Sequence, residues 1–447
     1  MRPSRKNTAQ RGMVLVTVLV IVLGLVAMVL LFAQGMKMEY RASANSIAAL
    51  EAGQTIEGAR RYLTHVLTDL ATPGTVPERD LYEAEEVPVG DAYFWLVGRP
   101  DAEFGEAESP EFGFVDEASK LNINTATREM IELLPNMTPD VAAAIMDWKS
   151  SPNNPQPDGA ESAIYLSGDP AYACKNAPFE SVEELRLVKG VTMSLLYGAD
   201  TNRNGVLDEN EQTDDIGESL SRGLLDCVTV CSREPNRRSD GTARIDVRRP
   251  QNPALDDLLQ RQLGAARAKQ IHDAANPHAA TIKSLLEFYL TGGVTATEAL
   301  QLEDALTASD GDYVPGHVNV NTAPREVLLC LPGIGDKFAD ALIALRRTKA
   351  PDQLVSVMWL TEALDRQNAL LAGPYVTTRS YQFGADVVAL GKAGHALRRS
   401  WMIFDTGGTA PVVICRSDWT HLGWPLGAAL RDDLDSGNLF AKADHDI

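Results

Sequence analysis

The chain has 447 residues, of which 45% are hydrophobic and 23% are charged, and its 41 basic and 61 acidic side chains give a net charge of −20. This length is enough for two or three globular domains with hydrophobic cores. The acidity argues against a nucleic-acid-binding protein, because a protein that acts on phosphate backbones normally presents a basic face.

The most informative feature of the sequence is a run of about twenty apolar residues from Met13 to Phe32. At roughly 1.5 Å per residue, such a run spans about 30 Å as a helix, which is the hydrocarbon thickness of a bilayer. The basic residues that flank it all precede it: Arg2, Arg5, Lys6 and Arg11. The sequence therefore predicts a single membrane-spanning helix with a short cytoplasmic tail and the long remainder outside.

The polar side of this run carries a candidate processing site. A secretory signal peptide would have a shorter apolar region closed by a small-residue cleavage site, and no such site ends this run. Gly12 instead precedes Met13, where a cut would leave the whole apolar helix on the mature protein. This arrangement resembles the processing site of type IV prepilins and type II secretion pseudopilins. We expect cleavage after Gly12; an uncleaved anchor and a removed signal are the alternatives.

Thr17 departs from the pilin pattern. Pilin-like subunits generally carry a glutamate at the fifth mature position, which is thought to pair with the amino terminus of the subunit above, but Thr17 stands there in this chain. A buried carboxylate in lipid is costly unless it has a partner. A subunit at the tip of a filament has nothing above it, so threonine suits that place. The alternative is that this is another kind of membrane anchor.

Beyond the membrane, the helix is predicted to continue as an amphipathic stem. Apolar residues recur there at three- and four-residue steps until Pro73 and Gly74 end the pattern. These residues are Ile56, Leu63, Val66, Leu67 and Leu70.

Strand-like runs follow the stem and return only near the end of the chain. They comprise residues 92–98, 111–115, 380–390, 397–404 and 411–416. The expected fold is therefore α+β, with a pilin-like long N-terminal helix packed on one antiparallel sheet. A large α-helical insertion is expected to interrupt this sheet.

The expected insertion contains an internal repeat. Residues 121–129 align without gaps on residues 318–326, and the match extends to residues 149 and 346. Each copy is predicted to form a short strand, a turn, a helix, a sharp loop and a second helix. A weak third copy begins at residues 244–247.

The second copy has the helix-hairpin-helix pattern in its loop, from Leu331 to Gly335. Glycines at this loop let the backbone turn tightly and approach a partner. The first copy has replaced both glycines, and Asp336 and Asp340 oppose Lys337 beside the second loop. We therefore expect structural packing here, and no contact with nucleic acid, because neutralising phosphates needs several unopposed cations.

Residues 200–211 satisfy every position of the EF-hand loop rule, with glycine at the sixth position and glutamate at the twelfth. Calcium takes six to eight oxygen ligands, so the chain must coil around it, and glycine permits the sharp turn. The predicted calcium ligands are Asp200, Asn202, Asn204, Val206 through its carbonyl, Asp208 and Glu211. We expect modest affinity and a structural role in folding the middle of the insertion; a polar turn without metal is the alternative.

The remaining chemistry of the sequence is sparse. The five cysteines leave at least one unpaired, and the expected disulfide joins Cys174 to Cys227 or Cys231, while residues 227–231 are expected to form a strand. Cys330 is expected in a repeat helix. The seven histidines are scattered, and no protease, hydrolase or phosphate-binding motif is present, so we expect no enzymatic activity.

Taken together, these motifs resemble the type II secretion system minor pseudopilin K, the general secretion pathway protein K family. The motifs that carry the resemblance are the Gly12-Met13 anchor without the glutamate, the Asn-x-Asn-Thr-Ala elements at Asn122 and Asn319, the loop at Leu331, the stretch 176–185 and the late strands near Arg398. The resemblance implies a pilin-like domain with a helical insertion, at the tip of the periplasmic pseudopilus that supports protein export across the outer membrane.

The resemblance also implies partners and a location. The expected partners are minor pseudopilins I and J, the major pseudopilin filament, the inner-membrane assembly platform and the prepilin peptidase, with methylation of Met13 after cleavage. The chain is expected in the inner membrane as a single-pass protein with its bulk in the periplasm. A membrane-anchored helix-hairpin-helix protein for DNA uptake and a minor pilin of a type IV pilus are the alternatives.

The expected organisation has five parts. They are a cytoplasmic leader at 1–12, a membrane segment at 13–33, the first part of the pilin-like domain at 34–116, the insertion at 117–375, and the second part with an acidic tail at 376–447.

Overall fold

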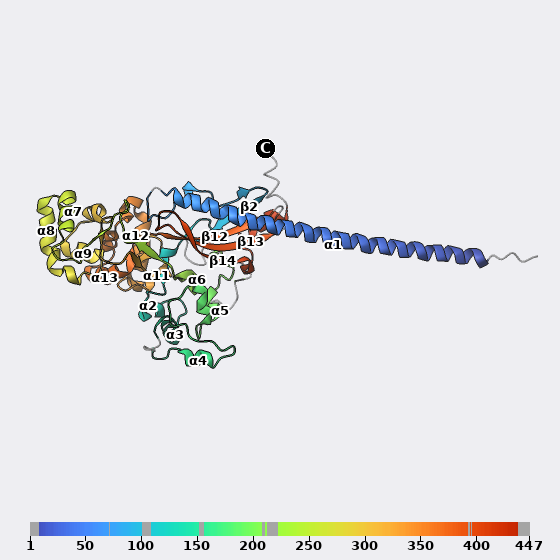
Figure 1. Ribbon diagram of the computed structural model, residues 1–447, viewed down its shortest axis with the longest axis horizontal. Coiled ribbons are helices and arrows are strands. Elements are labelled where there is room, and N and C mark those ends of the chain that lie inside the picture. The colour runs from blue at the N-terminus through green and yellow to red at the C-terminus, as the bar shows by residue number, and fades with distance from the viewer. Residues whose placement is uncertain are drawn as a thin grey trace, which may run out of the picture.

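The computed structural model describes residues 9–70, 72–100, 109–151, 156–207, 211, 222–391, 394 and 396–436. Figure 1 shows one long helix whose N-terminal half projects away from the rest of the molecule, a sheet beside its other half, and helices gathered beyond the sheet. The described chain is thus α+β, with a long N-terminal helix and an antiparallel sheet, as predicted.

The long helix α1 runs from Ala9 to Thr68 without interruption. Every residue from Met13 to Phe32 is exposed. Of the described residues, this helix is the one long and apolar enough to cross a membrane by length and composition. Its later turns bury one face, including Ile56, Leu63 and Leu67, which the periodicity predicted. The two halves of α1 therefore have different requirements: one needs an apolar environment, and the other is covered by the sheet.

The main sheet joins strands from both ends of the described chain. Its order is β1 (Val87–Val89), β2 (Ala92–Val97), β12 (Gln382–Leu390), β13 (Leu397–Asp405) and β14 (Val412–Asp418), and β3 (Val115–Asp116) also pairs with β12. All these pairs are antiparallel. Alternate side chains of β2, β12 and β13, among them Phe94, Phe383 and Phe404, form one core with the buried face of α1.

The expected strand at residues 111–115 was largely wrong. Only Val115 and Asp116 form a strand there, and Phe112 makes an isolated bridge with Val97. The Gly98 amide donates to the Glu111 carbonyl and the Gly113 amide donates to the Leu96 carbonyl, each at 2.7 Å, so this segment contacts β2 at the bridge and pairs with β12 from Val115 onward.

The residues between β3 and β12 are mainly helical. The helices are α2 (Arg128–Glu132), α3 (Pro139–Lys149), α4 (Ser162–Leu166), α5 (Met193–Tyr197), α6 (Leu224–Cys227), α7 (Pro253–Leu263), α8 (Ala265–Ala275), α9 (Leu285–Gly292), α10 (Ala296–Leu302), α11 (Arg325–Leu329), α12 (Gly335–Thr348) and α13 (Arg366–Ala372). In Figure 1 they form two groups, with α2 to α6 below the sheet and α7 to α13 at the end opposite the projecting half of α1. One further helix, α14 (Gly427–Asp435), follows the sheet.

Short parallel strand pairs divide this helical part into three units of similar topology. The pairs are β4 (Leu121–Asn122) with β5 (Val228–Thr229), β7 (Ile245–Asp246) with β8 (Leu306–Thr307), and β10 (Val318–Asn319) with β11 (Val376–Thr377). A further pair is antiparallel: β6 (Arg233–Pro235), which follows β5, pairs with β9 (Tyr313–Pro315), which precedes β10. The weak third copy predicted at residues 244–247 therefore forms a unit of its own, between the two stronger ones.

Equivalent hydrogen bonds recur in all three units. The amides of Ile123, Val247 and Val320 donate to the carbonyls of Thr229, Thr307 and Thr377 at 2.9, 2.9 and 3.0 Å. In the first and last units a cation also closes the turn: Lys149 donates to the carbonyls of Ile123 and Ala126, and Arg346 to those of Val320 and Ala323. The segments that repeat in the sequence thus also repeat the same backbone hydrogen bonds in the structure. The assignment of the helix pairs in these units as helix-hairpin-helix modules stays a prediction.

The loop between α11 and α12 shows why glycine stands at its tip. Gly333 has a φ of +80°, and a Cβ there would lie 2.2 Å from the carbonyl oxygen of Asn368 in α13. Asn136 occupies the matching place in the first copy and has a φ of 54°, which asparagine tolerates better than most residues. The two loops therefore share a left-handed turn, and the second lies close against α13.

The predictions for the cysteines need correction. Cys174, Cys227, Cys231, Cys330 and Cys415 are all free thiols, so the expected disulfide from Cys174 is not formed. The expected strand at 227–231 is reduced to Val228 and Thr229, because Cys227 ends the short helix α6. Burial raises the pKa of the Cys231 thiol to about 12. Cys330 lies in the core beside α11, as expected.

Packing of α1 on the sheet generates a first prediction. Leu63 is 0% exposed in the core between α1 and the sheet, whereas Leu50 on the same helix is 70% exposed. We expect Leu63→Ala to lower the free energy of unfolding by about 2–5 kcal/mol, since it leaves a cavity. Leu50→Ala should change it by less than about 0.5 kcal/mol. Urea unfolding of the detergent-solubilised chain measures both, and equal effects would contradict this packing.

Candidate metal-binding loop

The EF-hand-like segment follows α5. Its predicted ligands Asp200, Asn202, Asn204, Val206 and Glu211 lie within the described residues, while Asp208 lies outside them. Asp200 is 1% exposed, Asn204 is 0% and Glu211 is 7%, which is unusual for polar side chains and places them in the interior. Burial of this kind requires partners for each polar atom.

Asp200 at the first position organises the turn of the loop. One of its carboxylate oxygens accepts a hydrogen bond from the amide of Asn204 at 3.1 Å, and the other accepts from the amide of Gly205 at 2.7 Å. Gly205 has a φ of +83°, the conformation that the loop rule requires of its sixth residue. The side-chain oxygens of Asn202 and Asn204 likewise accept from amides two residues ahead. The backbone therefore coils around its own side chains.

Glu211 at the twelfth position closes the loop on its beginning. One carboxylate oxygen of Glu211 accepts hydrogen bonds from the Thr201 amide at 2.8 Å, the Thr201 hydroxyl at 2.6 Å and the Asn202 amide at 3.1 Å. The first and last predicted ligands are thus brought to the same place, as a bidentate twelfth-position ligand requires.

Burial destabilises the ionised form of the first predicted ligand, Asp200. Burial, with added repulsion from Asp226 and Glu211, raises the pKa of Asp200 to about 7. A hard cation would relieve this cost, and the donors are all oxygens, the type that calcium prefers. Among the described residues no group of three or more His, Cys, Asp or Glu side chains could hold a metal ion, and Asp208, the third predicted carboxylate, lies outside this set. The two carboxylates and the amide oxygens fit an EF-hand donor set.

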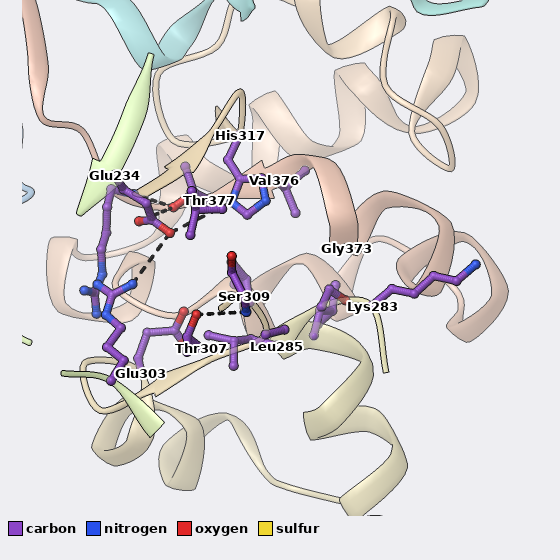
Figure 2. A pocket seen from close by; sticks show the side chains of 17 residues that line it. Glu234, Lys283, Leu285, Glu303, Thr307, Ser309, His317, Gly373, Val376 and Thr377 are labelled. Atoms are coloured by element: carbon purple, nitrogen blue, oxygen red, sulfur yellow. Dashed lines mark hydrogen bonds and ion pairs between the residues drawn. The ribbon is translucent and has the colours of Figure 1, made fainter. Parts of the chain in front are cut away.

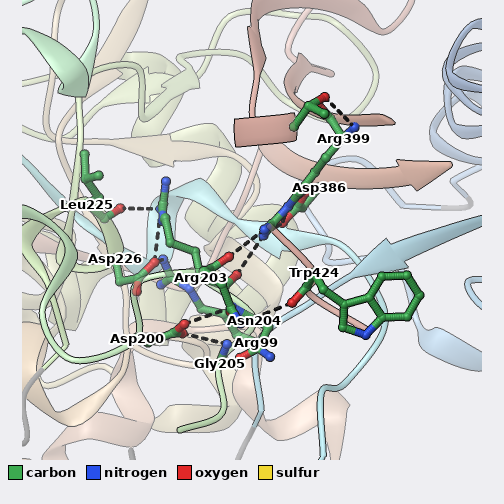
Figure 3. Close-up of polar contacts among 12 residues, drawn as sticks. Arg99, Asp200, Arg203, Asn204, Gly205, Leu225, Asp226, Asp386, Arg399 and Trp424 are labelled. Carbon is green, nitrogen blue, oxygen red and sulfur yellow. Dashed lines mark hydrogen bonds and ion pairs between the residues drawn. The ribbon is translucent and has the colours of Figure 1, made fainter. Parts of the chain in front are cut away.

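Residues far away in the sequence surround the loop, as Figure 3 shows. Asp226 accepts hydrogen bonds from Arg99 at 2.8 Å and from Arg203 at 3.1 Å. Burial disfavours the ionised form of Asp226, but these guanidinium groups, together with that of Arg222, hold its pKa well below the usual range. Asn202 donates through its side chain to the carbonyl of Trp424 at 3.2 Å.

Sequence reasoning missed these neighbours. Arg99, Asp226, Asp386 and Trp424 carry no motif, Arg399 was noted only as part of a late strand, and up to 222 positions separate these residues from the loop residues that they contact. Only the fold brings them together, so the sequence offered no signal that could have found them.

The predicted processing residues lie at the start of the same chain, far from this loop in the sequence. Gly12 and Met13 fall within α1, and of these two the structure describes only the side chain of Met13. The Thr17 hydroxyl donates to the Met13 carbonyl one turn earlier at 2.8 Å. The threonine therefore satisfies its own polar group inside the apolar helix, which a carboxylate could not do.

A separate polar pocket lies among the repeat units (Figure 2). Several of its charged side chains lie near an opposite charge: Arg244 lies 3.6 Å from Glu234, and Arg379 lies 3.3 Å from Asp304. Glu303 accepts hydrogen bonds from Tyr289 and Ser356. Burial lowers the pKa of His317 on the same wall. These contacts are those of a polar seam between packed units.

Part of the chain is similar to a known family. Residues 119–197 match the family model described as "Type II secretion system (T2SS), protein K". A segment of 55 residues is 36% identical to the type II secretion system protein K of Klebsiella pneumoniae; it makes up 12% of this chain and spans 17% of that relative. The resemblance that the sequence motifs predicted is therefore confirmed over this segment.

A solved structure also aligns with most of the chain. It is the crystal structure of the GspK-GspI-GspJ complex from the type 2 secretion system of enterotoxigenic Escherichia coli. One of its chains aligns over 85% of this chain and 99% of its own length, with 10% identity and a TM-score of 0.42. A likeness at this score does not establish a shared fold.

The loop generates a second prediction. A Cβ on Gly205 would lie 2.4 Å from Pro100, whereas a Cβ on Gly241, which has the same φ of +83°, would meet nothing within 4 Å. Both alanine variants should lose about 1–2 kcal/mol of stability to the left-handed backbone. Gly205→Ala should lose about 1–3 kcal/mol more through the clash with Pro100. Thermal unfolding measures the difference; identical melting curves would show that the loop does not lie against Pro100.

Proposed function

We propose that this chain, which carries a type II secretion system protein K domain at residues 119–197, is a minor pseudopilin at the tip of the periplasmic pseudopilus. In this role it supports protein export across the outer membrane without catalysing a reaction. The observation that carries the proposal is α1, which exposes an apolar half and buries the other half against a sheet. Such a helix can anchor the subunit in lipid and then pack against neighbouring stems.

The start of α1 supports maturation by a prepilin peptidase. Cleavage between Gly12 and Met13 would leave the exposed apolar residues 13–32 on the mature subunit, with Met13 as the methylated first residue. Burial of this surface among other stems drives assembly. Thr17 requires no charged partner from a subunit above, which suits the end of the filament.

The position of the helical part supports a role in capping the filament. In Figure 1 its helices α7 to α13 lie at the end of the molecule opposite the projecting half of α1. With α1 in the inner membrane, this bulk lies on the periplasmic side and occupies the space where a further subunit would stack. The proposed partners are minor pseudopilins I and J, the major pseudopilin filament below them and the inner-membrane assembly platform.

Calcium is the proposed ligand of the loop at 200–211. Asp200, Asn202, Asn204, Asp208 and Glu211 would hold it through side-chain oxygens, and Val206 through its carbonyl. The ion would supply positive charge to a group of buried carboxylates and so stabilise the middle of the helical part. The raised pKa of Asp200 and the closure of the loop by Glu211 support this assignment.

Two contacts weigh against the alternative of a DNA receptor. Gly333, at the tip of the loop with the helix-hairpin-helix pattern, lies against the backbone of α13. Arg325 at the base of the same hairpin is paired with Asp336 at 2.8 Å and Asp340 at 2.7 Å. A loop and a cation engaged in this way are poorly placed to neutralise phosphates.

The proposed maturation generates a third prediction. We expect Gly12→Val to block cleavage, because a peptidase that cuts after a small residue has no room for a branched side chain. Mass spectrometry of the purified protein should then find the leader still attached, while Gly24→Val, inside the apolar run, should be processed. A Gly12→Val protein that begins at Met13 would overturn the prepilin assignment.

The proposed calcium site generates a fourth prediction. A ligand present at 100 times its dissociation constant stabilises the folded chain by about 2.7 kcal/mol. Excess calcium should therefore raise the melting temperature of the full chain, and a chelator should reverse the rise. Glu211→Gln should lose most of this response, whereas Asp352→Asn, an exposed acid far from the loop in the sequence, should keep it. A melting curve unaffected by calcium would contradict the site.

A further inference from the structure

A buried arginine of the sheet donates hydrogen bonds to the backbone of the candidate metal loop. Arg399 lies on β13 and is 1% exposed. Its guanidinium donates through Nη1 to the carbonyl of Asn202 at 2.5 Å and through Nη2 to the carbonyl of Arg203 at 3.0 Å. Figure 3 shows this guanidinium between the strand and the loop. The third and fourth positions of the loop are thus held by a residue nearly 200 positions away.

Asp386 on the neighbouring strand β12 fixes the orientation of Arg399. Nε of Arg399 donates to the two carboxylate oxygens of Asp386 at 2.9 and 3.1 Å, and Asp386 is itself 3% exposed. A buried ion pair is stable only when its remaining donors also find acceptors. The carbonyls of Asn202 and Arg203 are those acceptors, so the loop must be in place for the buried ion pair of the sheet to be stable.

Other residues on or beside the sheet also contact the loop. The Arg203 guanidinium lies over the ring of Trp419 at 4.1 Å, just beyond strand β14. The Asn202 side chain donates to the carbonyl of Trp424, and Gly205 lies against Pro100, three residues after β2. The third, fourth and sixth positions of the loop all contact residues on or beside strands of the main sheet.

We propose that Arg399, oriented by Asp386, is a positioning residue that couples cation binding in the loop to the docking of the helical part on the sheet. This inference rests on the proposed calcium site. Asn202 provides a predicted side-chain ligand while its carbonyl is held by Arg399, so the sheet fixes the loop before the cation arrives. Less ordering is then needed on binding, which strengthens it.

The coupling acts in both directions. If the docked sheet favours cation binding, a bound cation must favour docking by the same factor. Calcium should therefore stabilise β12 and β13, although neither strand contributes a ligand. The orientation of the helical part relative to the stem would in this way respond to the calcium concentration around the protein.

Calorimetric titration of the full-length, detergent-solubilised chain with calcium chloride tests the first direction. The double variant Asp386→Asn/Arg399→Gln removes both buried charges together, so neither is left unpaired. We expect its calcium dissociation constant to rise at least fivefold over that of the wild type. Arg398→Gln, one residue earlier and exposed, is the matched control and should stay within about twofold.

Hydrogen exchange tests the reverse direction. In the wild type, calcium should slow amide exchange in residues 382–390 and 397–405, and the double variant should lose this response. If the double variant does not fold, Arg399→Lys serves instead: it keeps a charge beside Asp386 but lacks the planar fork that reaches two carbonyls. Its dissociation constant should rise in the same direction.

The outcomes separate the two proposals. A wild type that binds no calcium would overturn the calcium site and the coupling with it. A wild type that binds calcium, alongside a folded variant with an unchanged dissociation constant and an unchanged exchange response, would overturn only the coupling. Weaker binding together with a lost exchange response supports the role of Arg399.

Discussion

Strand β12 is the element on which the rest of the structure depends, because it joins the two ends of an interrupted sheet. It pairs with β2 and β3 from before the helical part and with β13 from after it. All nine of its residues are buried. The core between α1 and the sheet therefore forms only when chain segments almost 300 positions apart come together, which costs loop-closure entropy.

Two adjacent acids connect this sheet to the helical part. Asp116 at the end of β3 accepts hydrogen bonds from Asn319 at 3.1 Å and from Ser380 at 2.6 Å, which ties the last repeat unit to the approach of β12. Glu117 accepts from Thr229 at 2.6 Å and pairs with Lys120, which ties the first unit. Burial raises the pKa of Asp116, and its many donors work against that shift. Together with Arg399 beside the loop, these polar contacts orient the helical part on the stem and sheet.

The features that sequence could predict are those encoded by near neighbours. The faces of α1 follow from the spacing of Ile56, Leu63 and Leu67, and the strands at 382–390 and 397–405 follow from continuous β-prone runs. The loop at 200–211 has a ligand spacing that fixes its turn at Gly205. Predictions failed at residues 111–114, which contact β2 through an isolated bridge, and at Cys227, which ends the short helix α6.

The sequence by itself determined an apolar helix able to span a membrane, a repeated strand-and-helix unit and an oxygen-rich loop, since each is a local pattern of side chains along a few turns of chain. Only the tertiary structure decided that this loop lies against the sheet, with Asp386 and Arg399 beneath it and Asp226 alongside. The physical reason is that a buried charge is stable only where several charged or hydrogen-bonding partners surround it. Partners that are distant in the sequence come together only in the folded chain.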